Sequence, residues 1–181
     1  GAGGAFDSDA VVRFPLRVLV SDFTPSPFGV RTSLNGDLFE AGSSVTAETR
    51  ATLFSGGPYI DAEARITAQL TPRPFRSEHP QAAGFMFDTG MQPAAIVLAQ
   101  QSTQVDAQGE ARHTFGLDAN IGNQVVAGTL TVEGAVRDDR GKYVAGAASA
   151  YFVAVDRLVC LHSTEWVFRE DEPANVEYLV V

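Results

Sequence analysis

Strict alternation of apolar and polar residues along Ala62–Thr71 is the feature that most restricts how this chain folds. In an extended strand, successive side chains point to opposite faces, so one face here would be entirely apolar. The apolar face holds Ala62, Ala64, Ile66, Ala68 and Leu70, and the other holds Glu63, Arg65, Thr67, Gln69 and Thr71. A period of two predicts a half-buried strand of an antiparallel sheet rather than an amphipathic helix.

The same alternation recurs in two other segments, Val45–Phe54 and Thr129–Arg137. In the first, we expect an inward face of Val45, Ala47, Ala51 and Leu53 and an outward face with Glu48 and Arg50. In the second, we expect an inward face of Leu130, Val132 and Val136 and an outward face of Thr129, Thr131, Glu133 and Arg137. The chain has almost no helix signal, so these strands predict an all-β protein.

Clusters of turn-forming residues separate the predicted strands. They are Asn35-Gly36-Asp37, Gly56-Gly57-Pro58, Asp118-Ala119-Asn120 and Asp138–Gly141. Such residues favour tight reversals, and we expect them to reverse antiparallel strands. Many short strands with turns at this spacing predict an antiparallel β-sandwich of immunoglobulin-like or fibronectin III-like architecture. Residues 72–95 break the pattern, and we predict a long excursion between sheets with one short strand at Gly84–Phe87.

Composition limits the classes of partner. The chain of 181 residues is 45% hydrophobic and 19% charged, which favours a folded core over disorder. Its net charge of −9 argues against nucleic acid and anionic membranes, because both require clustered Lys and Arg. No apolar run approaches the roughly 18–20 residues that span a bilayer. The single cysteine, Cys160, excludes an intrachain disulfide, and we expect it to be a small buried hydrophobe.

Two segments have the character of module boundaries. Near the start, a predicted strand at Leu16–Val20 runs into a connector with two prolines, and a new strand begins near Gly29. Near the end, an apolar run at Ala145–Val155 passes through Asp156 and Arg157 into a new strand at Leu158–His162. A last strand is predicted at Asn175–Val181, where the sequence ends. We therefore divide the chain into residues 1–21, the end of a preceding module or an added strand; 22–155, a complete sandwich; and 156–181, the first strands of a next, truncated module.

No residue pattern indicates catalysis or metal binding. His79, His113 and His162 lie on separate predicted elements; we expect His79 to be solvated, His113 to face outward or pair with Thr114, and His162 to border an acidic loop. Glu170-Asp171-Glu172 lacks the alternating spacing of a calcium loop, and Asp138-Asp139 fits a hairpin turn better than paired acids. The chain contains no HExxH, no Gly-x-Ser-x-Gly and no second cysteine. We predict no catalytic, cofactor-binding or metal site and no enzyme activity.

Several segments resemble the macroglobulin-like domains of the alpha-macroglobulin family, particularly its bacterial members. The connector PLRVLVSDFTPSPFGV is similar to the family's junction between domains, and ETRATLFSGGPYIDAEARITAQLTP is similar to its second and third strands. VDAQGEARHTFGLDAN, with Asp106, Gln108 and Gly109, resembles its Asp-x-x-Gly hairpin, and VRDDRGKYVAGAASAYFVAVDRLVCL resembles a last hairpin passing into the next domain. The order and spacing of these segments, over about residues 14–181, carry the resemblance.

The resemblance implies a structural scaffold fragment of a broad-range protease inhibitor, in which cleavage of a bait segment triggers a conformational change that traps the protease. The implied partners are neighbouring macroglobulin domains and target proteases, and the implied location is periplasmic or extracellular, with a lipoprotein anchor in the parent as one option. A Cys-x-Glu-Gln thioester is excluded here, because His162 and Ser163 occupy the Glu and Gln positions after Cys160. We favour a family-typical loop over a bait for residues 72–95, although Arg73 and Arg76 offer cleavage sites.

Two binding-class alternatives stay open. A carbohydrate-binding module would present exposed aromatic side chains, for which the candidates are Phe54, Tyr59, Trp166 and Phe168. Phe54 and Tyr59 bracket the Gly-Gly-Pro turn, whereas Trp166 in a small sandwich is more often packed in the core or between domains. A surface adhesin or an immunoglobulin-like spacer is the other alternative.

Overall fold

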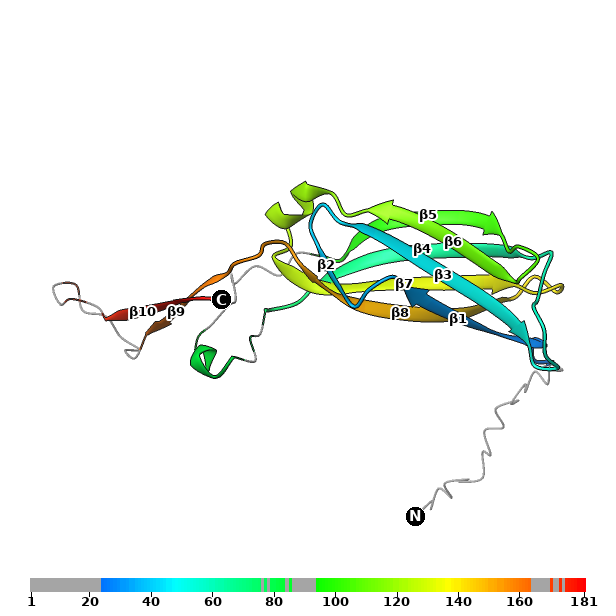
Figure 1. Cartoon of the computed structure of the whole chain (residues 1–181), viewed down its shortest axis with the longest axis horizontal. Helices are drawn as coiled ribbons and strands as arrows, with labels where there is room; N and C mark the ends of the chain where they lie inside the picture. Colours follow the sequence, from blue (N-terminus) through cyan, green and yellow to red (C-terminus); the bar gives the residue numbers. More distant parts are fainter. Residues whose placement is uncertain are drawn as a thin grey trace, which may run out of the picture.

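The computed structural model describes residues 24–75, 77, 79–83, 85, 94–163, 170, 173 and 175–181. Two packed sheets form an elongated sandwich (Figure 1). The smaller sheet has the strand order β1 (Phe28–Leu34), β3 (Ser44–Leu53), β6 (Glu110–Gly116). The larger sheet has the order β2 (Leu38–Glu40), β8 (Tyr143–Val153), β7 (Ala127–Arg137), β4 (Glu63–Pro72), β5 (Ile96–Gln104). The all-β sandwich predicted from the sequence is confirmed.

The alternating pattern of Ala62–Thr71 corresponds to strand β4, whose apolar side chains are buried between the two sheets. This strand pairs antiparallel with β7 on one side and with β5 on the other, so it lies inside the larger sheet. The five apolar residues predicted to face inward have between 0% and 6% of their surface exposed. The inward faces predicted for β3 and β7 are also confirmed, and Thr49 joins them as a fully buried polar residue.

The strand order differs from a series of simple hairpins. Among the four predicted turn clusters, only Asp138–Gly141 connects neighbouring strands of one sheet, β7 and β8. The clusters at 35–37, 56–58 and 118–120 each lead from the smaller sheet to the larger one, so they connect strands of different sheets rather than paired neighbours. Strand β2 pairs parallel with the end of β8, which is an exception to the predicted antiparallel pairing. Turn residues determine that the chain bends, but the partner of each strand depends on which apolar faces meet.

Two five-residue turns have the same construction. In Asp106–Glu110, the carboxylate Oδ1 of Asp106 accepts hydrogen bonds from the backbone N–H of Gln108 at 2.9 Å and of Glu110 at 2.8 Å. Gly109 adopts a φ of 74°, a left-handed conformation that a side chain disfavours. The resemblance to an Asp-x-x-Gly turn is therefore confirmed locally, but the turn joins β5 and β6, which belong to different sheets.

The second turn of this kind is Asp138–Lys142. Oδ1 of Asp138 accepts from the backbone N–H of Arg140 at 3.0 Å and of Lys142 at 2.8 Å. Gly141 has a φ of 84°, and its N–H donates to the carbonyl of Asp138 at 3.0 Å. The carboxylate thus satisfies backbone N–H groups of the turn that would otherwise need a hydrogen-bond acceptor from outside the turn.

The two sheets lie close together around Gly134 and Gly146. Thr32 on β1 and Thr49 on β3 place their hydroxyl oxygens 3.1 Å apart inside the sandwich, and Thr32 also donates to the carbonyl of Gly146 at 2.8 Å. A Cβ atom on Gly134 would lie 2.6 Å from the hydroxyl oxygen of Thr32 and closer still to that of Thr49. The two glycines therefore allow backbone and hydroxyl groups to meet where larger side chains would separate the sheets.

The long excursion between β4 and β5 contains one short 3₁₀ helix, η1 (Pro80–Ala82), in its described part. Phe85 is not in a strand, and the other three residues of the strand predicted at Gly84–Phe87 lie outside the described residues. A second 3₁₀ helix, η2 (Ala119–Asn123), connects β6 to β7. Within the described ranges, neither of these helices nor any other has the length and apolar character needed to cross a membrane.

Beyond the sandwich, β9 (Val159–Ser163) and β10 (Val176–Val180) pair antiparallel as a separate two-stranded sheet. Both strands were expected from the sequence, and they begin and end within one residue of the predicted bounds. The hairpin extends from the end of the sandwich opposite to the one where β1 begins (Figure 1). The division of the chain into modules at residues 21 and 155 stays a prediction.

Candidate functional site

The segment that enters the sandwich, Thr24–Pro27, is fixed at its junction with β1. Phe28, the first residue of β1, is 1% exposed, and its ring stacks on that of Tyr59 with centroids 4.0 Å apart. The carbonyl of Pro27 accepts a hydrogen bond from the N–H of Phe54 at 2.9 Å. A strand was predicted to begin near Gly29, and this prediction is confirmed to within one residue.

Asp138 also holds this entering segment. Its second carboxylate oxygen, Oδ2, accepts from the hydroxyl of Ser26 at 2.8 Å and from Nη2 of Arg140 at 3.0 Å. Arg140 donates from Nη1 to the carbonyl of Thr24 at 2.8 Å. Burial of the Asp138 carboxylate disfavours its charge, but the hydrogen bonds from Ser26, Lys142 and Arg140 outweigh this and lower the pKa to about 2. Residues more than 100 positions apart therefore meet around one carboxylate.

The segment that leaves the sandwich, Val155–Leu158, leads directly into β9. Leu158 exchanges two backbone hydrogen bonds with Val181, at 2.8 and 2.9 Å, which continues the pairing of β9 with β10. The ring of His162 on β9 lies 5.4 Å from that of Phe85, so the excursion between β4 and β5 reaches the hairpin. The entering and leaving segments lie at opposite ends of the long axis of the sandwich (Figure 1).

One face of the β9–β10 hairpin is apolar and exposed. Its five large side chains, each between 49% and 74% exposed, are Val159, Leu161, Val176, Tyr178 and Val180. The register places Val180 opposite Val159 and Tyr178 opposite Leu161, so the apolar side chains form one continuous face. A two-stranded hairpin with such a face is marginally stable alone, because its apolar side chains gain stability only when they are covered.

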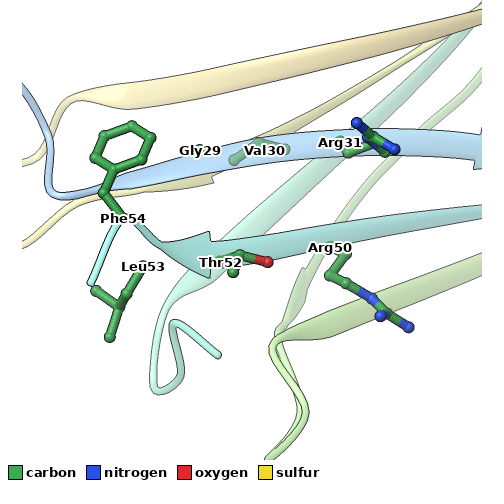
Figure 2. Close-up of a pocket in the computed structure, with 7 residues that line it drawn as sticks. All are labelled: Gly29, Val30, Arg31, Arg50, Thr52, Leu53 and Phe54. Atoms are coloured by element: carbon green, nitrogen blue, oxygen red, sulfur yellow. The ribbon is translucent and has the colours of Figure 1, made fainter. Parts of the chain in front are cut away.

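One depression on the described part of the sandwich, of about 360 Å³, is lined by Thr24–Ser26, Phe28, Phe54 and Lys142–Val144. Two others lie elsewhere on the sandwich. One, of about 830 Å³, lies between the start of β2, the end of β8 and the segment after β4, and its apolar lining includes Leu38, Phe75 and Tyr151. The other, of about 330 Å³, is lined by Gly29–Arg31, Arg50 and Thr52–Phe54 (Figure 2). Neither brings together the acid, base and nucleophile that catalysis requires. Both are surface hollows between strands.

The aromatic platform considered for carbohydrate binding does not form at the Gly-Gly-Pro turn. Phe54 is 76% exposed and lies beside Gly29, as Figure 2 shows. Tyr59, however, is half-buried and stacked on Phe28, so it is part of the packing. Trp166 and Phe168 lie outside the described residues. Phe54 therefore remains as a single exposed aromatic side chain at this turn, whereas sugar-binding faces use two or more.

The histidines are not brought together. His79 is exposed, as predicted, and its Nδ1 accepts from the N–H of Gln81 at 3.3 Å. His113 was predicted to face outward or to pair with Thr114, and this was wrong. Its side chain shares the inward face of β6 with Ala111 and Phe115, is half-buried, and stacks on Phe115 with centroids 5.9 Å apart. Alternation along β6 predicts this orientation once Phe115 is recognised as core.

The remaining candidates for metal and thiol chemistry can be placed only in part. Across the described ranges, no three His, Cys, Asp or Glu side chains cluster in a way that would hold a metal ion. Glu170 is exposed, and Asp171 and Glu172 lie outside the described residues. Cys160 is 1% exposed and its Sγ donates to the carbonyl of Leu179 at 3.1 Å, which confirms the predicted buried thiol. Arg73 is exposed and Arg76 lies outside the described residues, so the bait interpretation of 72–95 stays untested.

Comparisons with known proteins identify the fold. No family model matches the sequence, and no curated protein matches it. Escherichia coli alpha-2-macroglobulin activated by porcine elastase matches with a TM-score of 0.61 and 15% identity, over 88% of this chain and 14% of that chain. Salmonella alpha-2-macroglobulin reacted with methylamine matches with a TM-score of 0.59 and 14% identity, over 80% of this chain and 9% of that chain. Trypsin-activated alpha-2-macroglobulin from E. coli matches with a TM-score of 0.55 and 17% identity, over 78% of this chain and 10% of that chain.

These matches confirm, at the level of the fold, the resemblance to macroglobulin-like domains. The chain spans about one seventh of the E. coli structure or less. Residues 24–155 make up about three quarters of the 181 residues, so a match over 88% of the chain includes residues outside the sandwich on at least one side. The similarity therefore extends beyond a single β-sandwich, an architecture that many unrelated proteins share.

Proposed function

We propose that this chain is a scaffold segment of an alpha-2-macroglobulin-like protease trap. The observation that carries the proposal is the extent of the structural match, which includes the sandwich and residues beyond it. In the proposed division, residues 22–155 are one complete macroglobulin-like module, residues 1–21 belong to a preceding module or add a strand, and residues 156–181 begin the next one. The segment has no catalytic role of its own, and it binds no cofactor or metal.

The positions of the two connecting segments support a role in a linear series of modules. Because the chain enters at one end of the sandwich and leaves at the other, neighbouring modules would follow each other along its long axis. The apolar face of the β9–β10 hairpin would then be covered by the remainder of its own module. The partners in this proposal are adjacent modules of the same protein and, through the whole protein, proteases of broad range. The proposed location is periplasmic or extracellular.

The experiment that tests the proposal uses the complete parent protein and several unrelated proteases. Scattering and native electrophoresis would report a change of shape after one cleavage, and paired assays would report protease activity on a small peptide and on a large protein substrate. We expect compaction, retained activity on the peptide and lost activity on the protein. A protease whose catalytic nucleophile is mutated cannot cut the parent, should cause no compaction, and is the matched control. Unchanged shape, with full activity on both substrates, would refute the trapping function.

A second experiment tests whether the entering segment transmits the change. Proline fixes the backbone φ, so replacing Pro25 and Pro27 by glycine makes the connector more flexible. We expect the double variant to trap proteases less well, so that more protease activity on the large protein substrate remains. Circular dichroism should show that this segment keeps its fold. Trapping equal to that of the unaltered parent would show that the connector's rigidity is not used.

A further inference from the structure

The two Asp-x-x-Gly turns provide an internal comparison for the role of Asp138. In both turns a single carboxylate oxygen, Oδ1, accepts the backbone N–H groups two and four residues later. Asp106 forms its turn in this way while exposed to solvent, and within the described part of the chain its Oδ2 has no protein hydrogen-bond donor. One oxygen is therefore sufficient to build the turn. Any function of the second oxygen of Asp138 is additional to it.

That second oxygen connects the turn to the entering segment. Oδ2 of Asp138 accepts from Ser26 and Arg140, and Arg140 extends the connection to the carbonyl of Thr24. Thr24 and Ser26 flank Pro25, so the segment is held at two points around a residue with fixed φ. Two attachments separated by one residue restrain the direction of a chain segment, which a single attachment would not do.

The environment of this network makes its hydrogen bonds stronger than those of a surface pair. The side chain of Asp138 is inaccessible to solvent and that of Arg140 is 35% exposed, whereas the neighbouring Asp139 is 81% exposed. Hydrogen bonds to ionised groups are stronger than neutral ones, and exclusion of water reduces their screening. Lys142 contributes its backbone N–H to Oδ1, and Arg140 contributes the charge that opposes the carboxylate.

We propose that Asp138 and Arg140 are positioning residues that fix the direction in which the chain enters the sandwich, by holding Thr24 and Ser26 against the β7–β8 turn. The turn itself persists without this function, as the Asp106 turn demonstrates. The proposal concerns the geometry of the connector and does not depend on protease trapping. If the proposed function also holds, the same contacts set the orientation of the preceding module.

The test measures a distance distribution between two spin labels by pulsed electron paramagnetic resonance on the full chain. In a Cys160→Ala background, one label is placed by Thr24→Cys, an exposed position whose backbone carbonyl, the acceptor for Arg140, is kept. The other is placed by Ser102→Cys, an exposed position on β5. Distributions are compared for the labelled parent and for Asp138→Asn, Arg140→Gln and Ser26→Ala. Asp106→Asn is the matched control, because it alters the equivalent turn without touching the connector.

We expect a narrow distribution in the labelled parent and in Asp106→Asn, and at least a two-fold broader one in Asp138→Asn and Arg140→Gln. Ser26→Ala, which removes one attachment, should give an intermediate width. Thermal unfolding of each variant establishes that the sandwich is folded. If Asp138→Asn does not fold, the width measured for Arg140→Gln tests the proposal. This variant keeps both backbone hydrogen bonds to Oδ1 of Asp138 that build the turn. A parent distribution as broad as that of the variants, or equal broadening in Asp106→Asn, would overturn the proposal.

Discussion

Replacing Gly134 by alanine should strongly destabilise the sandwich. Gly134 lies in the middle of β7, and the Thr32 and Thr49 hydroxyl groups of the opposite sheet occupy the space that a Cβ on Gly134 would need. The new Cβ would lie 2.6 Å from both Oγ1 of Thr32 and Cγ2 of Thr49, and closer still to Oγ1 of Thr49. Real Cβ atoms do not tolerate such contacts, so Thr49 must move or the sheets must separate.

The expected cost has two parts. Overpacking a core by one methyl group typically costs about 1–3 kcal/mol. Displacing a buried hydroxyl from its partner adds about 1–3 kcal/mol, because the group loses its hydrogen bond without regaining water. We therefore expect the free energy of unfolding to fall by about 2–6 kcal/mol. At roughly 2–4 °C per kcal/mol for a chain of this size, the melting temperature should fall by at least about 4 °C.

Gly116→Ala is the matched control, because Gly116 lies on β6 and a Cβ there would meet nothing within 4 Å. Its effect on unfolding free energy should stay within about 0.5 kcal/mol, as for other surface changes. Chemical denaturation, with both variants measured beside the parent, gives the difference. Adding Thr49→Ala to Gly134→Ala should recover part of the loss, because the two contacts with Thr49 are removed, whereas the 2.6 Å contact with Oγ1 of Thr32 remains. Equal stability of the two glycine variants would refute the reasoning.

Three further predictions concern other parts of the chain. Phe28→Ala should lower the free energy of unfolding by about 3–5 kcal/mol in denaturant titrations, whereas Phe54→Ala, at 76% exposed, should change it by less than about 1 kcal/mol; similar losses would contradict the assignment of Phe28 to the core. Because folding lowers the pKa of Asp138 from 3.8 to about 2, the ionised carboxylate stabilises the fold above about pH 4, and this stabilisation is lost as the pH falls through about 2. The melting temperature of Asp138→Asn should therefore approach that of the parent between pH 4 and pH 2. A constant difference between the two melting temperatures over that range would contradict the lowered pKa. The thiol of Cys160 should react with a thiol reagent at least ten-fold faster in denaturant than in buffer, and equal rates would show that it is accessible in the folded chain.

Local patterns in the sequence were enough to predict the fold class and much of the core. Alternation along β4, β3 and β7 depends only on the period of an extended chain, and it identified the buried faces correctly. The Asp138–Gly141 turn was also predictable, since Asp and Gly at those positions satisfy the local backbone without help from the rest of the molecule. The buried state of Cys160 was predicted from the usual burial of free cysteine side chains. In each case the information is local, so the sequence contains it.

Tertiary structure alone decided which strands are neighbours and which surfaces meet. The sequence contained no signal for the parallel pairing of β2 with β8, because alternation marks an apolar face without naming the strand beside it. Tyr59 and Phe54 flank the same turn. Tyr59 packs against the core because its ring stacks on that of Phe28, whereas Phe54 stays exposed. The second oxygen of Asp138 serves Ser26, which lies 112 residues earlier in the chain. Contacts between distant residues form only when the two sheets pack, so their consequences appear in the folded molecule and not in the pattern of its residues.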